Sequence, residues 1–422
     1  MTTIPDMMEL GDTGLRRYGG YIYEEFLPEL SGTKATKVYK EMSSNDSTIG
    51  AILFAIDMLL RQVGWRVNPA SQDQIDLYYA NFIDTCTEDM SMTWEDTISE
   101  ILSFLIYGWS YHELVYKIRL GKNADSSRNS RFNDGKIGWR KIPIRSQDSL
   151  YEWKFDQAGG LEGMWQTAFD FTKRYIPMEK ALLFRTALRK NNPEGVSVLR
   201  TAYRSWYFKK NMENLEGIGV ERDLAGLPVA EVPPELLNPN APPAQKSILS
   251  QIKQILRNVR RDEQEGVIFP KAYDENGKDL YNFKLLNTGG SRQLDTDKII
   301  NRYDQRIAMS VMADFMLLGS QKTGSYALSS DKTDLFTTAL TTWLDSIAAT
   351  FNRYAIPRLF ELNGFPTEKL PTLVHDDVRA VNLVELGDFI TKLAGAGMPL
   401  FPDDELEKYV RQQGKLPQRK EL

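Results

Sequence analysis

Apolar residues recur along the first half of the chain at two periods, one helical and one typical of strands. Their intervals predict a helix from Ser43 to about Gly64 and a helix-rich stretch from Gln74 to Tyr107. β-Branched and aromatic residues then mark five segments that we expect to be strands: residues 108–119, 136–144, 151–155, 161–166 and 181–185. This pattern predicts a helix-rich α+β fold.

The second half begins with a Pro-rich stretch and continues as helix, strand-like insertion and helix. A helix is expected at residues 244–265, with isoleucines on one face and four basic residues on the opposite face: Lys246, Lys253, Arg257 and Arg260. Another is expected at 295–318, with one apolar face formed by Ile300, Tyr303, Ile307 and Val311. Such a basic face is usually a solvated surface, and the alternative is a helix packed within an oligomer.

Asn276 and Gly277 lie between two strand-like segments, residues 266–269 and 280–286. Asn-Gly between strand formers is a strong hairpin signal, because the turn needs positive φ values that these residues tolerate. We therefore expect a β-hairpin inserted between the two amphipathic helices.

A further long helix is expected at residues 333–356. Large apolar residues are spaced three or four positions apart along it: Phe336, Leu340, Trp343, Ile347, Phe351 and Tyr354. Core packing explains this stripe better than cofactor binding does. Pro357 is expected to end or kink the helix.

The charge balance argues against general binding to polyanions. The 422 residues include 52 basic and 57 acidic side chains, a formal net charge of −5, so any DNA contact must be local. Cys86 is the only cysteine, which excludes an intrachain disulfide and favours a reducing cytoplasm. The N-terminal residues lack a signal-peptide pattern, and the most apolar run, Ile49–Leu60, is too short to cross a bilayer.

Candidate catalytic chemistry is sparse. His112 and His375 are the only histidines, and no His-Glu-x-x-His or Cys-x-x-Cys spacing indicates zinc. Gly319 and Gly324 have the spacing of a phosphate-binding loop, but Ser325 stands where that loop needs lysine. We therefore predict no catalytic residue, no cofactor and no metal site.

The segment from Asn191 to Val232 carries the most specific pattern. It contains a Pro-Glu-Gly turn, an aromatic Tyr-x-x-Trp-Tyr-Phe-Lys-Lys helix that we expect to be broken at Gly217 and Gly219, and an Ile-Gly-x-Glu-Arg-Asp-x-x-Gly-Leu-Pro-Val run. Together these features resemble the portal proteins of tailed bacteriophages. The order of helix, β-insertion and helix in the second half resembles the layout of the same family.

The resemblance implies a portal-type subunit with seven parts. Residues 1–240 would form a mixed α+β wing or body, 241–265 a stem helix, 266–291 the clip with its Asn276-Gly277 turn, and 292–318 the second stem helix. Residues 319–332 would form a tunnel loop, 333–374 a long wing helix and its connection, and 375–422 a helical crown.

The resemblance also implies a function: a ring of about twelve subunits at one capsid vertex, through which double-stranded DNA is packaged and ejected. The implied partners are further copies of the chain, the major capsid protein and scaffold, the terminase large subunit, and adaptor and tail proteins. DNA would be contacted without sequence specificity and no membrane would be involved. The implied location is the portal vertex of the virion, after assembly in the host cytoplasm.

Within that layout, Lys322, Thr323, Ser325 and Lys332 would face the DNA from the tunnel loop, because flexible polar residues and lysine suit phosphate contacts without base readout. An ordinary surface loop between two helices explains the same residues equally well. For the whole chain, the alternatives are a head–tail adaptor ring and a phage DNA-processing enzyme.

Overall fold

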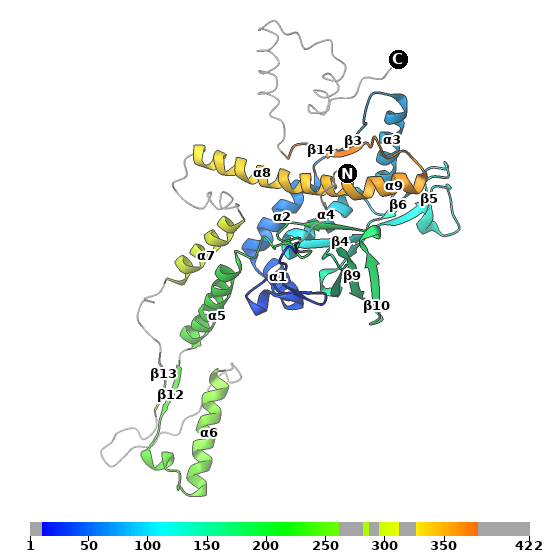
Figure 1. The fold of residues 1–422 in the computed structure, drawn as a ribbon. Helices are drawn as coiled ribbons and strands as arrows, with labels where there is room; N and C mark the ends of the chain where they lie inside the picture. The colour runs from blue at the N-terminus through cyan, green and yellow to red at the C-terminus, as the bar shows by residue number, and fades with distance from the viewer. Residues whose placement is uncertain (1–10, 226, 261–281, 287–294, 312–325, 379–422) are drawn as a thin grey trace. The chain divides into compact units, whose positions relative to one another are not determined.

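The computed structural model describes residues 11–225, 227–260, 282–286, 295–311 and 326–378. The chain divides into two compact units (Figure 1). Unit 1 combines Met1–Tyr203 with Ile307–Leu422, and unit 2 is Arg204–Arg306. The first boundary between the two units falls between Tyr203 and Arg204.

The helices of unit 1 follow the apolar periodicity of the sequence. They include α1 (Gly32–Asn45), α2 (Ser47–Arg61), α3 (Gln74–Glu88), α4 (Trp94–Tyr107), α8 (Tyr326–Thr350) and α9 (Ile356–Asn363). α2 begins at Ser47 because the Asp46 carboxylate accepts hydrogen bonds of 3.0 Å from the backbone N–H groups of Thr48 and Ile49. Its buried face is formed by Ile49, Ile52, Ile56 and Leu60.

α8 begins before the predicted Thr333 and ends at Thr350, before the predicted end at Ile356. It starts at Tyr326, so the segment expected to be a loop up to Lys332 is helical over its last seven residues. No glycine or proline follows Gly324 in that segment, and its serines disfavour a helix only weakly. At its other end α8 passes through one π-helical turn, Phe351–Ala355, into α9, whose first turn contains Pro357.

Short antiparallel sheets form the rest of unit 1. One has the order β11–β4–β7 (Ala181–Arg185, Trp109–Glu113, Ile144–Arg145), and another β10–β9–β8 (Lys173–Pro177, Leu161–Thr167, Leu150–Phe155). The two-stranded sheets are β14–β3 (Thr372–His375, Trp65–Asn68), β5–β6 (Val115–Ile118, Ile137–Lys141) and β1–β2 (Arg17–Tyr18, Tyr21–Ile22). The single strand expected at residues 108–119 is divided at Leu114, whose N–H donates to the Lys180 carbonyl at 2.7 Å.

Two buried clusters hold these layers together. The larger joins α2, α3, α4, α8 and α9 to the sheets, and α8 lies alongside α2 and α4 (Figure 1). Phe336, Leu340, Ile347 and Phe351 of the predicted stripe are buried in it, whereas Tyr354 is 40% exposed. The smaller cluster lies on the β8–β10 sheet, where the rings of Trp109 and Trp153 meet edge to face at 4.9 Å.

The start of the predicted crown belongs to a sheet of unit 1. In the β14–β3 pair, Thr372 lies opposite Asn68 and His375 lies opposite Trp65. The ladder is extended by a 2.8 Å hydrogen bond from the Asp376 N–H to the Gly64 carbonyl. Residues 379–422, which make up the rest of that part, lie outside the described residues.

Gly217 and Gly219 do not break the helix that contains them. α5 runs from Tyr203 to Ala225 through both positions, so the predicted break is wrong. A glycine inside a helix costs about 1 kcal/mol relative to alanine, and the flanking Glu213, Leu215 and Glu216 are good helix formers that favour continuation. The helix also begins later than expected, because Val198 and Ala202 lie in turns before it.

Candidate functional site

Within unit 2, α5 lies next to α7 (Thr296–Ser310). The rings of Phe208 and Tyr303 stack with centroids 6.3 Å apart and planes inclined by 17°. One position along each helix, Lys209 Nζ lies 2.6 Å from Asp304 Oδ1. Further on, Thr296 Oγ1 donates a hydrogen bond to the Glu216 carboxylate. From the Lys209–Asp304 pair to the Glu216–Thr296 hydrogen bond, residue numbers rise along α5 and fall along α7, so the two helices are antiparallel.

Lys209 is a buried charge in this helix pair, with its side chain only 2% exposed. A buried ammonium is costly unless carboxylates compensate it. Asp304 does so across the helix pair, and Glu213 lies 3.7 Å away on α5 itself. The ion pair therefore helps to set the register between α5 and α7. Sequence periodicity did not reveal this ion pair, because Asp304 lies on another helix nearly 100 residues away.

A strand ladder lies between α5 and α7 in the sequence. β12 (Leu227–Glu231) and β13 (Asn282–Leu286) are antiparallel, with Leu227 opposite Leu286 and Glu231 opposite Asn282. The sequence led us to expect that residues 280–286 pair with residues 266–269. The latter segment and the Asn276-Gly277 turn lie outside the described residues, so the hairpin stays a prediction. The described partner of β13 is β12.

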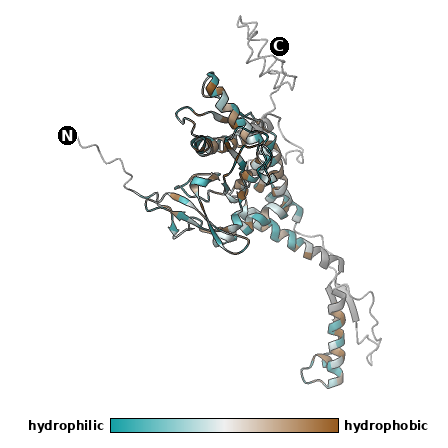
Figure 2. Cartoon of the chain, turned by 90° about the vertical axis from the view of Figure 1, so that its right-hand side faces the viewer, coloured by the Kyte–Doolittle hydropathy of each residue, from teal (hydrophilic) through white to brown (hydrophobic). Residues whose placement is uncertain are grey.

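α6 (Pro243–Arg260) is the amphipathic helix expected at 244–265. Lys246 and Lys253 are exposed on its basic side. Hydrophobic and hydrophilic residues alternate along the helix, as the brown and teal segments of Figure 2 show. On the apolar side Ile252 is 8% exposed, but Ile248 is 41% exposed, so that face is incompletely covered. Arg257 and Arg260 also belong to α6, and their side chains lie outside the described residues.

The predicted tunnel-loop residues are mostly beyond the described part of the chain. Lys322, Thr323 and Ser325 lie outside it. Lys332 lies in α8, where its backbone is helical and its side chain is not described. Their DNA-facing role therefore stays a prediction.

The turn from Asn192 to Gly195 is confirmed, and it is tightly packed. The Asn192 Oδ1 accepts a 2.9 Å hydrogen bond from the Glu194 N–H, and Gly195 has a φ of +57°. A Cβ atom on Gly195 would lie 2.2 Å from the carbonyl oxygen of Gly108. Both the backbone conformation and the close approach therefore require glycine at this position.

Glu194 carries the unusual electrostatics of this turn. Trp153 Nε1 donates a 3.2 Å hydrogen bond to its Oε1. Burial raises the pKa of the Glu194 carboxyl to about 7, and the hydrogen bond from Trp153 opposes that rise only in part. The carboxyl lines a pocket of about 470 Å³, shared with Ile22 and Tyr39. The sequence signal for this group was the Pro-Glu-Gly turn alone.

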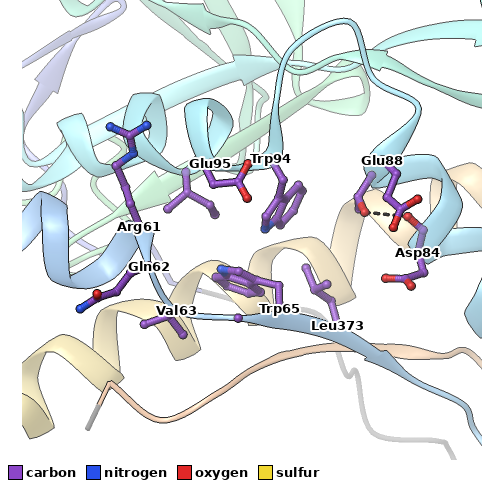
Figure 3. Close-up of a pocket in the computed structure, with 12 residues that line it drawn as sticks. Arg61, Gln62, Val63, Trp65, Asp84, Glu88, Trp94, Glu95 and Leu373 are labelled. Carbon is purple, nitrogen blue, oxygen red and sulfur yellow. Dashed lines mark hydrogen bonds between the residues drawn. The ribbon is translucent and has the colours of Figure 1, made fainter. Parts of the chain in front are cut away.

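A second pocket, of about 440 Å³, lies between α3, the start of α4 and β3 (Figure 3). The rings of Trp65 and Trp94 meet edge to face there at 5.7 Å, and Asp84, Glu88 and Glu95 line the same space. Across the described residues, no group of three or more His, Cys, Asp or Glu side chains could hold a metal ion. The pocket therefore lends no support to a two-metal nuclease, one form of the enzyme alternative.

His112 is a packed core residue of β4. It is fully buried, and its Nδ1–H donates to the Ile142 carbonyl at 3.1 Å. Burial lowers the pKa of His112 to about 4, which keeps the ring neutral at pH 7. Its environment explains the residue without a catalytic role.

Among the described residues, no helix is long and apolar enough to cross a membrane.

Comparison with known proteins identifies the family. A solved structure described as the virion of a native gene transfer agent particle shares the fold, with a TM-score of 0.52, 12% identity, and coverage of 91% of this chain and 94% of that chain. The neck of the native gene transfer agent particle, computed with C12 symmetry, has a TM-score of 0.50 at the same identity and coverage. An HK97 family phage portal protein from Corynebacterium diphtheriae has a TM-score of 0.43 and 10% identity, covering 81% and 94% of the two chains.

A family model described as the portal protein of Mu bacteriophage matches residues 36–413. The match includes both units, and it contains the Pro-Glu-Gly turn, the α5–α7 helix pair and the β12–β13 ladder. Because it covers most of the sequence, the chain belongs to the family of portal proteins of Mu bacteriophage.

Proposed function

We propose that the chain assembles into a closed ring of about twelve subunits at one capsid vertex, and that double-stranded DNA passes through the ring in packaging and ejection. Membership of the portal family carries the proposal. The C12 symmetry of the similar neck structure supports the subunit number. No catalytic step is assigned to the chain, because portals are structural proteins of the virion.

The contacts within unit 2 change the assignment of its parts. We propose that α5 and α7, joined by the stack of Phe208 on Tyr303 and the pair of Lys209 with Asp304, form the stem. The segment between them, with β12, α6 and β13, would then form the clip. This differs from the assignment by layout, in which α6 was the first stem helix. The exposed Ile248 on α6 fits a helix that is covered by another chain.

The remaining assignments follow from the family. Unit 1 would be the wing, and the segment before α8 would be the tunnel loop that presents Lys322 to DNA phosphates. The major capsid protein and scaffold would contact the ring during assembly in the host cytoplasm. The terminase large subunit, and later adaptor and tail proteins, would dock on the clip. A head–tail adaptor ring is the second interpretation, and the family match favours the portal.

Mass measurement and imaging of the purified particle test the proposal. Twelve copies of the 48.3 kDa chain give about 580 kDa, and negative-stain images should show rings with a central channel. Co-expression with scaffold and capsid protein provides the assembly partners if the chain alone is slow to close. A chain that stays monomeric at high concentration both alone and with those partners would contradict the proposal.

A further inference from the structure

The hairpin of β9 and β10 presents two exposed phenylalanines at its tip. The strands pair from Thr167 opposite Lys173 to Gly163 opposite Pro177. Between them, Phe169 is 93% exposed and Phe171 is 88% exposed. Scattered apolar side chains on a surface need no explanation, but two large rings that share one projecting turn form a patch that gains free energy when another surface covers it.

The turn is held rigid in spite of an unfavourable backbone. Phe171 has a φ of +60°, a conformation that glycine or asparagine adopts far more easily. The Ala168 N–H donates to the Thr172 carbonyl at 2.8 Å, and the Asp170 carboxylate accepts hydrogen bonds from the Thr172 hydroxyl at 2.6 Å and from Arg174 at 3.1 Å. A strained position that keeps a large apolar side chain in solvent points to a contact made by that side chain.

Unit 1 also contains a pocket suited to such a tip. The 470 Å³ pocket beside Glu194 has apolar walls formed by Ile22, Leu30, Ala35, Tyr39, Tyr107 and Val196. Phe26, which is 80% exposed, stands among its lining residues. On the polar side, Lys190 pairs with Glu24 at 3.0 Å and Arg200 with Glu25 at 2.8 Å, while Arg189 adds a further positive charge. Asp170 of the tip is already paired with Arg174 at 3.1 Å, so the two apolar rings of the tip, and not its charge, match the apolar walls of the pocket.

A ring closed by rotation needs two different complementary surfaces on every subunit, because each subunit meets its neighbours head to tail. The tip and the pocket are such a pair on one unit of the chain. We propose that, in the assembled ring, Phe169 and Phe171 of each subunit insert into the pocket lined by Phe26 and Tyr39 of the next copy. This inference rests on the proposed ring.

Cysteine cross-linking tests the contact, because the native Cys86 is fully buried and should not react. The Phe169→Cys/Phe26→Cys double variant keeps Phe171 at the tip, and a short bismaleimide should link its copies into a ladder of covalent oligomers. The two single variants should form no ladder. Neither should Phe169→Cys/Tyr18→Cys, since Tyr18 is 81% exposed but does not line the pocket.

Separate outcomes distinguish the contact from the proposed function. Rings seen by imaging without a ladder from the Phe169/Phe26 pair would overturn the contact and leave the ring standing. A wild-type chain that forms no ring, alone or with its assembly partners, would overturn both. As a second measurement, Phe169→Ser/Phe171→Ser should raise the subunit concentration needed for half-assembly by about tenfold or more, with an unchanged monomer fold. Unchanged assembly of that variant would also overturn the contact.

Discussion

Replacing Glu194 with glutamine should stabilise the protein at alkaline pH and remove part of its pH dependence. The carboxyl has a pKa of about 7 in the folded chain, raised by burial from an ordinary value of 4.5, so the folded state holds its proton more tightly than the unfolded state does. The contribution of Glu194 to stability is therefore fully present below pH 4.5 and is lost as the pH rises through 7. The full difference is worth about 3 kcal/mol above pH 7. Because Glu194 lines a pocket that water can enter, we expect roughly 1–3 kcal/mol.

Glutamine preserves the shape of the side chain and an oxygen that can accept the hydrogen bond from Trp153. Urea unfolding should therefore show a stabilised Glu194→Gln variant at pH 8 and a difference of less than about 1 kcal/mol at pH 5. Glu95→Gln is the matched control, since Glu95 is an exposed carboxylate whose loss should change stability by less than about 0.5 kcal/mol at either pH. Parallel stability curves for wild type and Glu194→Gln between pH 5 and pH 8 would refute the reasoning.

Four further changes test other parts of the structure. Lys117→Met leaves Asp89, 3.0 Å away and equally buried, without its ammonium, and should cost about 3–5 kcal/mol in denaturant unfolding; a loss below 1 kcal/mol would count against the pair. Lys209→Ala should speed hydrogen exchange in α5 and α7 and leave α2 unaffected, whereas uniform exchange would contradict the helix pair. Asn276-Gly277→Val-Val should weaken terminase binding to intact rings, and unchanged affinity would show that this turn is not part of the docking surface. Lys322→Ala should preserve rings but alter the salt dependence of DNA retention, unlike the surface control Lys122→Ala; identical retention across salt would remove Lys322 from the channel.

Local signals predicted several elements of unit 1. The apolar period between residues 49 and 60 predicted α2, but the helix was expected from Ser43, so its start at Ser47 and the separate helix α1 were missed. The strands expected at residues 151–155, 161–166 and 181–185 correspond to β8, β9 and β11. Each of these elements can be predicted from its own segment, because that segment contains the capping side chain or the apolar period that defines the element. Such local signals do not show which strands pair with each other. The register of β14 on β3, for example, joins segments more than 300 residues apart.

The errors at α5 and α8 have one cause. Glycines in α5 and serines before Asp331 lower local helix propensity, and both segments were taken for breaks or loops. Helix propensity differs by only about 1 kcal/mol for each of these residues, and a helix continued from a favourable neighbour needs no new nucleus. A real stop requires a stronger signal, such as Gly108, which ends α4 with a φ of +92° in close contact with the Glu194 carbonyl.

The candidate stem could have been found from charge and aromatic spacing read across the chain. Phe208 and Lys209 on α5 meet Tyr303 and Asp304 on α7, and Glu216 meets Thr296. Over more than one turn of an antiparallel helix pair, contacts that advance along one helix retreat along the other, as they do from Lys209–Asp304 to Glu216–Thr296. An aromatic–basic dipeptide in one helix and an aromatic–acidic dipeptide in another are therefore a testable pairing signal, stronger than the amphipathic wheel that drew attention to α6. A buried Lys209 needs a carboxylate wherever it lies, and that requirement links two helices that no local pattern connects.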